Sequence, residues 1–351
     1  MFAVLSLLVL LACGSAAQQP HAGAARVELQ PFALAARQYE LTLEYLGQPL
    51  PESDRARLTK AIAGSNEAAA VRELEAVLDK YTLAVVEINP ESRVKVEQGQ
   101  AKPELVEGGT RVFLVKVINQ AGVTAPLEVD SPNQAPVYQK STGTPEPPQR
   151  ITQADVRDRW AQFSIYRKQP MRTRLSGLGL EYQILEVFSR DSGKRSAKLS
   201  FHVGQGTQDI GFRNETVIVF NALPARAVKL RVRDEKGQPT TGAFVFRDSV
   251  GRVYPAPSKR LAPDFPFQTQ IYRADGEVIR LPDGVYTVTY TRGPEYVTET
   301  RKVVVDGDAP AELAFDLKRW IDPSRRGWYS GDHHIHAAGC AHYENPTEGV
   351  E

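Results

Sequence analysis

Four of the six histidines in this chain lie in its last nineteen residues, and three of them belong to the run Asp332-His333-His334-Ile335-His336. Side chains at positions i and i+2 of a strand share one face, so Asp332, His334 and His336 are expected to point the same way and His333 the opposite way. Imidazole nitrogen with carboxylate oxygen suits zinc, manganese or iron, and water bound to such an ion becomes a nucleophile near neutral pH. The spacing therefore predicts a divalent-metal site.

The neighbouring residues leave several roles open. Tracts rich in histidine also occur as surface decoration or as hydrogen-bonded core residues, and the metal interpretation is favoured because the spacing, the acidic residue and the strand-like context coincide. His342 lies in a loop-like stretch and could be a further ligand, a substrate contact or a solvated side chain. Cys340 is a soft ligand candidate, although a packed or idle thiol is favoured. No catalytic residue can be named from the sequence.

A family resemblance rests on the same residues. The motif Trp328-Tyr329-Ser330-Gly331-Asp332-x-His334-x-His336 resembles the opening strand of the PHP-like metallohydrolases of the CehA/McbA type. The resemblance implies a distorted β/α barrel that hydrolyses phosphoester, carbamate or related bonds, with His334 and His336 as metal ligands and Asp332 as a ligand or an orienting residue. Residues 319–351 would then be the start of an incomplete metallohydrolase domain, and this fragment alone is expected to be inactive.

Composition places the chain among soluble proteins with more than one core. It has 351 residues, of which 42% are hydrophobic and 24% charged, enough for two or three separate cores. The 43 Lys and Arg residues balance 42 Asp and Glu residues, so the net charge is only +1. No basic excess indicates nucleic acid or anionic membrane as a partner.

The N-terminus indicates export. Residues 1–19 are expected to be a signal peptide or a lipoprotein signal, because residues 1–12 are almost wholly apolar and Leu10-Leu11-Ala12-Cys13-Gly14 resembles a lipoprotein box. Cys13 would then carry a lipid that attaches the protein to a membrane, and cleavage after Ser15-Ala16-Ala17 is the alternative. The protein is expected to be periplasmic, membrane-anchored or extracellular.

Changes in hydrophobic period divide the remaining chain. Residues 20–82 are predicted as a helical segment, in which Ser53 and Asn66 can cap two of the helices. Residues 83–130 are predicted as an Ig-like β region, residues 131–150 as a Pro-rich linker, and residues 151–225 as a second β region in which His202 is structural.

Residues 226–318 are predicted as a further β-sandwich. Asp234-Glu235-Lys236-Gly237 and Leu281-Pro282-Asp283-Gly284 are typical of hairpin turns. Their order along the chain resembles the transthyretin-like modules of the carboxypeptidase regulatory type, which implies a spacer or binding role. The predicted fold class is mainly β and multi-domain, with Ig-like and transthyretin-like sandwiches, a small N-terminal helical segment and the first strand of a truncated β/α barrel at the C-terminal end.

Two functional hypotheses follow. In the first, the chain is the β-rich scaffold and first metal-binding motif of an exported hydrolase that acts on a small-molecule or ester-like substrate. In the second, it is a non-catalytic cell-envelope protein whose β-sandwich modules bind a glycan or protein partner, and the terminal histidines are incidental.

Overall fold

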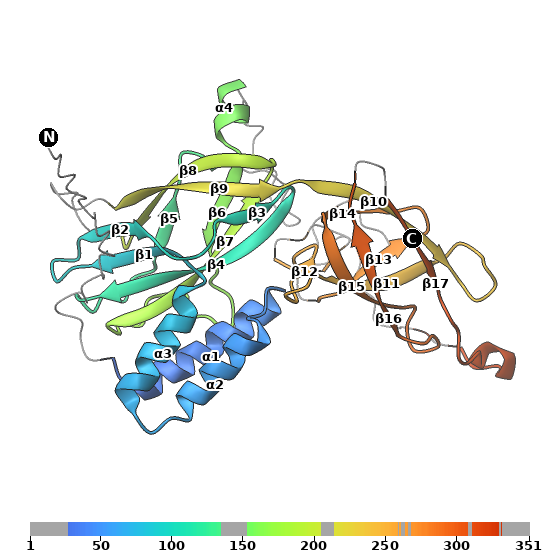
Figure 1. Ribbon diagram of the computed structural model, residues 1–351, viewed down its shortest axis with the longest axis horizontal. Coiled ribbons are helices and arrows are strands. Elements are labelled where there is room, and N and C mark those ends of the chain that lie inside the picture. The colour runs from blue at the N-terminus through green and yellow to red at the C-terminus, as the bar shows by residue number, and fades with distance from the viewer. Residues whose placement is uncertain are drawn as a thin grey trace, which may run out of the picture.

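The computed structural model describes residues 27–134, 153–204, 214–258, 260, 264–265, 268–307, 311–329 and 331. These residues form two β-sandwich modules that follow one another along the long axis of the molecule, with three helices packed beside the first (Figure 1). The prediction of a mainly β, multi-domain chain with a small N-terminal helical segment is therefore confirmed. Within the ranges just given, no helix is long and apolar enough to span a bilayer.

The first module, called the N-terminal sandwich, is built from nine strands. They are β1 (Thr82–Ile88), β2 (Val94–Gln98), β3 (Glu104–Val106), β4 (Gly109–Asn119), β5 (Glu128–Asp130), β6 (Ala161–Ile165), β7 (Leu180–Ser189), β8 (Gly193–His202) and β9 (Glu215–Leu223). The larger sheet has the order β2-β1-β4-β7-β6, and the smaller has the order β3-β9-β8-β5. Trp160, Phe201 and Phe220 are among the fully buried residues of the core that the two sheets enclose. A short helix, α4 (Gln153–Asp158), precedes β6.

The two β regions predicted as separate units, 83–130 and 151–225, form this one sandwich together. β4 from the first region pairs with β7 from the second along its whole length, and β5 pairs with β8 in the other sheet. The prediction of an Ig-like region followed by an independent β region is therefore corrected. The strands of 83–130 need these partners, because β4 is buried on both faces and would otherwise have β1 as a neighbour on one side only and no covering sheet.

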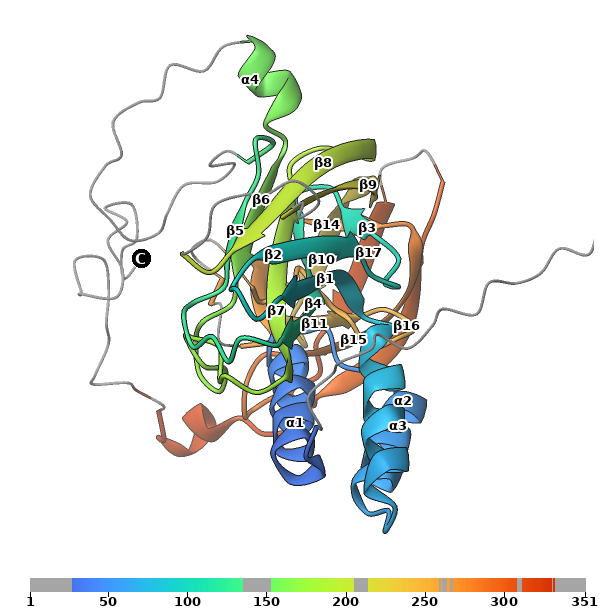
Figure 2. The same ribbon diagram turned by 90° about the vertical axis from the view of Figure 1, so that its left-hand side faces the viewer.

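The helical layer covers the outer face of the larger sheet. It consists of α1 (Leu29–Tyr45), α2 (Glu52–Ile62) and α3 (Glu67–Asp79), which lie together beyond the strands in Figure 2. Asn66 caps α3, since its side chain accepts a hydrogen bond from the Ala69 N–H at 3.0 Å, and this prediction is confirmed. The prediction for Ser53 is wrong, because α2 begins after Pro51 and already contains that serine.

A buried ionic network attaches the helices to the sheet. Lys116 of β4 donates to Glu75 Oε1 at 2.5 Å and to Asp79 Oδ2 at 2.9 Å, both on α3. The Tyr182 hydroxyl of β7 donates to Asp79 Oδ1 at 2.8 Å. Burial by itself would lower the pKa of Lys116, but the two carboxylates outweigh burial and the pKa is raised. The helical layer is thus fixed to the sheet by charge as well as by apolar contacts.

The second module, called the C-terminal module, contains eight strands. They are β10 (Ala225–Arg233), β11 (Thr241–Arg247), β12 (Val253–Tyr254), β13 (Ile271–Ala274), β14 (Val278–Pro282), β15 (Gly284–Thr291), β16 (Glu299–Val305) and β17 (Ala311–Asp316). One sheet has the order β14-β10-β17; the other has the order β12-β11-β15-β16, with β13 also paired to β11. Phe244, Tyr286 and Phe315 fill the space between the two sheets. A 3₁₀ turn, η1 (Pro323–Arg326), follows β17.

Both turns predicted in this module are present, but each joins strands of different sheets and not the two strands of a hairpin. The turn at Asp234–Gly237 leads from β10 to β11, and the turn at Leu281–Gly284 leads from β14 to β15. In each case the two strands belong to opposite sheets of the sandwich. Turn residues reverse the chain, but they do not determine which strand becomes the hydrogen-bonding partner.

Candidate functional site

The residues predicted to hold a metal lie outside the described part of the chain. These are Asp332, His334 and His336, and the other residues singled out near the two ends of the sequence, His333, Cys340, His342 and Cys13, also lie outside it. The metal site therefore stays a prediction, as does the barrel strand that would carry it. Among the residues that the structure does describe, no group of three or more His, Cys, Asp or Glu side chains could hold a metal ion.

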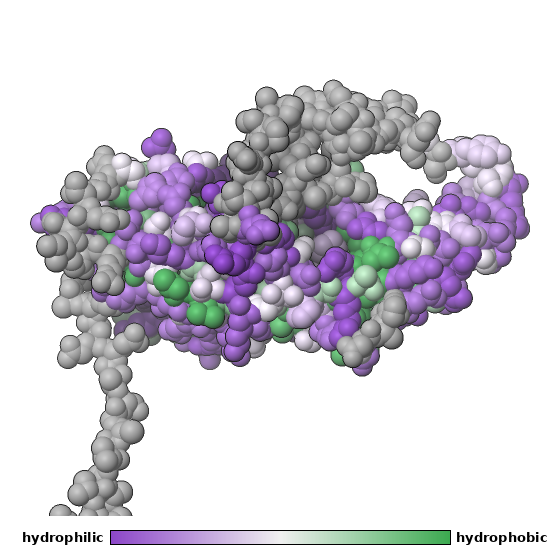
Figure 3. Space-filling view, turned by 90° about the horizontal axis from the view of Figure 1, so that it is seen from above, coloured by the Kyte–Doolittle hydropathy of each residue, from purple (hydrophilic) through white to green (hydrophobic). Residues whose placement is uncertain are grey.

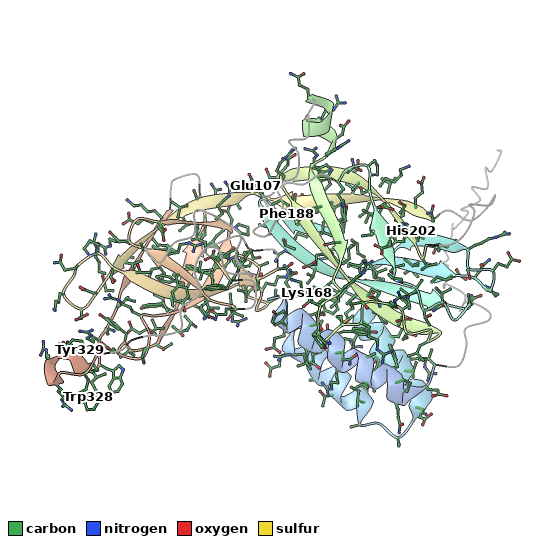
Figure 4. All side chains as sticks on the ribbon, turned by 180° about the vertical axis from the view of Figure 1, so that it is seen from behind. Glu107, Lys168, Phe188, His202, Trp328 and Tyr329 are labelled. Atoms are coloured by element: carbon green, nitrogen blue, oxygen red, sulfur yellow. The ribbon has the colours of Figure 1, made fainter. Side chains whose placement is uncertain are left out.

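The described residues singled out by the sequence lie far apart. Trp328 and Tyr329, which open the histidine motif, are exposed at one end of the molecule, whereas His202 lies on the N-terminal sandwich (Figure 4). His202 Nε2 is 2.9 Å from Asp130 Oδ2 in a largely exposed pair that links β8 to β5. Its role as a structural residue fits this position. None of these side chains forms a site with another.

The described site with the most convergent polar groups lies where the two modules meet, here called the junction. Glu107, which follows β3, accepts a hydrogen bond from the Ala225 N–H at 3.0 Å through Oε2 and forms a salt bridge to Arg280 at 3.0 Å through Oε1. Figure 4 shows Glu107 between the two modules. The β9 strand also leads into β10 at this point, with only Pro224 between them. Covalent and ionic links therefore coincide at the junction.

The turn after α1 forms a third side of the junction. Gln48 accepts from the Val112 N–H at 3.2 Å and donates to the Thr110 carbonyl at 3.4 Å, so its side chain takes the place of a neighbouring strand at the start of β4. The carbonyl of Gly47 accepts from the Val253 N–H of β12 at 2.7 Å. The helical layer, the N-terminal sandwich and the C-terminal module thus meet at one turn.

Gly47→Ala tests how tightly this turn is held. Gly47 has φ +73°, and an added Cβ would overlap the Pro257 ring and lie 3.0 Å from the Val253 Cβ. We expect the substitution to lower the free energy of unfolding by about 2 kcal/mol, because backbone strain and steric overlap add. Urea denaturation followed by circular dichroism would measure the loss.

Gly237→Ala is the matched control for that variant. Gly237 has nearly the same φ, +74°, but a Cβ there would meet nothing within 4 Å. We expect a loss of about 1 kcal/mol from backbone strain alone. Equal losses in the two variants would show that the turn does not bear on the junction.

A loop of the C-terminal module forms another wall of the junction, and Arg260 organises it. Its guanidinium donates to five backbone carbonyls, those of Pro255, Phe265, Gln268, Thr269 and Gln270, at distances from 2.7 to 3.3 Å. Burial lowers the pKa of Arg260 to about 10, so the side chain remains a cation at neutral pH. The loop is thus folded around a buried positive charge.

The same loop also contacts the N-terminal sandwich. The hydroxyl of Ser258, itself buried, donates to Glu186 of β7, and Ser164 of β6 donates to the other oxygen of that carboxylate at 3.2 Å. The loop therefore shares a buried carboxylate with two strands of the larger sheet.

A cavity of about 230 Å³ lies in the junction. The N-terminal sandwich contributes residues 106–111, and the C-terminal module contributes residues 253–256, Arg273 and residues 278–280. Val106, Val253 and Ile279 supply apolar surface, while Arg111, Arg273 and Arg280 supply positive charge. Such a mixture of apolar walls and a few fixed polar groups occurs in small-molecule sites, although a volume of about 230 Å³ lies below their usual range of about 300–1,000 Å³. This cavity is called the junction pocket.

Arg111 is the distinctive residue of the junction pocket. It is only 4% exposed, and it donates to the Tyr254 hydroxyl at 2.6 Å while its guanidinium lies 5.2 Å from the centre of that ring. Tyr254 in turn donates to Asp248 at 3.2 Å. Burial raises the pKa of Tyr254, so the phenol stays neutral and can transmit this hydrogen-bond chain. The arrangement can hold and orient a charged group of a ligand, but it offers no activated nucleophile among the described residues.

The junction pocket was not predicted from the sequence. Arg111 and Tyr254 are 143 residues apart, and nothing in either segment indicates the other. One local signal was present, because Arg111 begins a strand whose following residues are almost all apolar. A charged side chain in a strand buried on both faces needs a specific partner. That signal identifies a residue of interest but not its partner.

Comparison with known proteins identifies no family. No protein family model and no curated protein matches this chain. Among solved structures, the pilus 2b backbone protein of group B streptococcus matches with 10% identity and a TM-score of 0.20, over 62% of this chain and 96% of the other. The major pilin subunit BcpA of Bacillus cereus matches with 13% identity and a TM-score of 0.21, over 67% of each chain.

A surface-layer protein also matches. Domains 4–9 of surface layer protein SbsC show 14% identity and a TM-score of 0.22, over 64% of this chain and 33% of the other. TM-scores this low carry no argument about the function of this chain.

The comparisons correct the family resemblance drawn from the histidine motif. The chain is similar in part to pilin and surface-layer proteins, and no family model links it to the PHP-like metallohydrolases of the CehA/McbA type. The resemblance to that family is therefore withdrawn. It rested on a few residues from Trp328 onward, and a motif that short matches by chance more readily than a whole domain does.

Proposed function

We propose that this protein is an exported, non-catalytic cell-envelope protein in which two β-sandwich modules form one rigid binding unit. The observation that carries the proposal is the junction, where polar contacts, some of them buried, join the turn after α1, the N-terminal sandwich and the C-terminal module around a pocket. A fixed orientation between modules makes a pocket between them a permanent feature of the molecule rather than a passing gap. The hydrolase hypothesis gives way to this alternative.

The salt bridges and hydrogen bonds across the junction support rigidity. Glu107 contacts Arg280 and the Ala225 backbone, Arg111 contacts Tyr254, and the Gly47 carbonyl contacts the Val253 N–H. Val106 of β3 is counted among the core residues of the C-terminal module, so apolar packing also crosses the boundary. Modules joined only by a flexible linker would lack such buried contacts.

Export is supported by the apolar N-terminal segment with Cys13, which indicates a signal peptide or a lipoprotein signal. The pilin and surface-layer matches are compatible with this location, but they do not carry the argument. The surface of the modules is mostly hydrophilic, with small separate hydrophobic areas in the face shown in Figure 3, as expected for a body in contact with water. A glycan or a protein is the proposed partner of these modules.

The predicted metal ligands are kept as a separate proposal. His334, His336 and Asp332 have donor atoms suited to a divalent ion such as zinc, manganese or iron. Binding of an ion there would not by itself establish catalysis, because a catalytic zinc site also needs an open position for water and surrounding groups that orient the ligands.

Two measurements test the proposed function on the full chain. In the cells that produce it, protease added after the outer layers are opened, with the cytoplasmic membrane intact, is expected to cleave the protein while a cytoplasmic control stays intact. The purified chain, supplied with zinc, manganese or iron, is expected to hydrolyse activated phosphoesters and carbamates no faster than the His334→Ala/His336→Ala double variant. Protection from protease until the cytoplasmic membrane is lysed would contradict the envelope location, and turnover lost in the double variant would contradict the non-catalytic role. Metal bound by the wild-type chain and lost from the double variant would support the predicted ligands alone.

A further inference from the structure

The charges around the junction pocket are unevenly compensated. Arg273 forms a two-point salt bridge with Asp264, at 2.8 and 2.6 Å, and Arg280 is paired with Glu107. Arg111 forms no salt bridge to a carboxylate within the described ranges, and its Nε is buried there without a hydrogen-bond partner. Two of the three cations that line the pocket are thus paired directly with a carboxylate, whereas Arg111 is linked to one, Asp248, only through the Tyr254 hydroxyl.

An uncompensated buried guanidinium is costly. Removing a charge from water without an ion pair costs several kcal/mol, and a buried donor without an acceptor adds to that cost. Tyr254 offsets part of it with its hydroxyl and its ring face. Nε itself is closed to solvent, so the donors left for an anion in the pocket are the terminal N–H groups that do not contact Tyr254.

We infer that the junction pocket binds a small organic carboxylate with a short branched apolar body, and that Arg111 is its anchor. The inference rests on the proposed function, since it names the ligand class of the same pocket. The planar guanidinium presents paired N–H donors that match the two oxygens of a carboxylate. Val106, Val253 and Ile279 provide the apolar surface that the body of the ligand contacts.

The charge balance favours a carboxylate over phosphate or sulfate. One uncompensated arginine suits one negative charge, whereas a doubly charged anion would bring an excess charge next to Glu107 and into a partly apolar pocket. The volume of about 230 Å³ also suits a molecule of a few heavy atoms rather than an oligosaccharide.

The pocket walls come from both modules, so the ligand would contact each of them. A ligand that binds only the folded, joined state stabilises that state by mass action. Binding would therefore raise the temperature of unfolding and reduce hydrogen exchange at β3, β4 and β12 together, because residues from these three strands line the pocket.

The test compares isovalerate with isovaleramide, which has nearly the same shape without the charge. Titration calorimetry on the full chain is expected to show binding of isovalerate that is at least about tenfold tighter than binding of the amide. Sulfate, as a doubly charged anion, is expected to bind more weakly than isovalerate. Arg111→Met is expected to weaken isovalerate binding by about tenfold or more, and Arg111→Lys, which keeps the charge but not the paired donors, by less. Arg231→Gln removes an exposed positive charge of β10 outside the pocket and should leave binding unchanged.

The outcomes separate the inference from the proposed function. Equal affinity for isovalerate and isovaleramide would overturn the carboxylate assignment while leaving a pocket that binds neutral ligands. Stronger binding of sulfate would overturn it in favour of inorganic anions. No binding of either isovalerate or its amide would overturn the inference and show that Arg111 only ties the modules together through Tyr254, with the envelope location untouched. If Arg111→Met does not fold, the comparison of acid with amide on the wild-type chain decides alone.

Discussion

Replacing Arg260 with methionine is expected to lower the free energy of unfolding by about 3–5 kcal/mol, the largest loss that we predict for a single substitution. Methionine keeps an unbranched apolar stem of similar reach but has no donor for the five carbonyls that the guanidinium contacts. Arg260 is 8% exposed, so water cannot replace those bonds without opening the loop. Urea denaturation at neutral pH would measure the loss.

The same substitution should also weaken ligand binding in the junction pocket. Pro255 and Arg273 both line the pocket, and the folded loop holds both in place. The Pro255 carbonyl accepts a hydrogen bond from Arg260, and Arg273 forms a salt bridge with Asp264 of the loop. We therefore expect weaker isovalerate binding in Arg260→Met even where the variant is fully folded.

Two further variants sharpen this test. Arg260→Lys is expected to fall between wild type and Arg260→Met, because an ammonium has three donors for five acceptors. Arg231→Met removes an exposed arginine of β10 and should change stability by less than about 0.5 kcal/mol. A loss of under about 1 kcal/mol in Arg260→Met would mean that the carbonyls are hydrated in the native protein, and the role assigned to Arg260 would be wrong.

Lys116→Met is expected to cost about 3 kcal/mol at neutral pH. The lysine is the shared cation of Glu75 and Asp79, and its removal leaves two carboxylates beside one another at the buried face between α3 and β4. Tyr182 still donates to Asp79, but a neutral hydroxyl cannot balance both charges. The helical layer should therefore loosen from the sheet before the rest of the N-terminal sandwich unfolds, which hydrogen exchange of α3 would detect.

The pH dependence of this variant has a defined sign. At high pH the raised pKa of Lys116 means that its contribution is complete below the ordinary lysine value of 10.5 and is lost as pH rises through the higher folded-state value. Above pH 10.5 the free energy of unfolding of the wild type should then fall toward that of the variant.

Lys95→Met is the control for Lys116→Met. Lys95 of β2 also pairs with a carboxylate, that of Glu97 at 2.6 Å, but both side chains are largely exposed. An exposed pair contributes at most about 1 kcal/mol. A difference between wild type and Lys116→Met that does not change with pH would contradict the ionic explanation and point to lost packing instead.

Local features of the sequence predicted the elements better than their partners. Asn66 was identified as a helix cap because capping depends only on the next few residues, and it caps α3. The turn at Leu281–Gly284 was identified because turn chemistry is equally local, yet the strands that it joins pair elsewhere. The pairing of β4 with β7, across the Pro-rich segment, has no local signal at all. Strand partners are chosen by the whole arrangement of apolar faces, which no short window contains.

The amino-acid sequence alone determined the mainly β composition and the helical segment, and it alone carries the predicted export signal and the histidine motif, because each depends on residue type and spacing along the chain. The tertiary structure alone decided that residues 83–130 and 151–225 form one sandwich and that Arg111 meets Tyr254 in a pocket between two modules. The physical reason is that burial and charge compensation depend on distance in space. Arg111 looks like an ordinary strand residue until the fold removes it from water and leaves its charge without a carboxylate among the described residues.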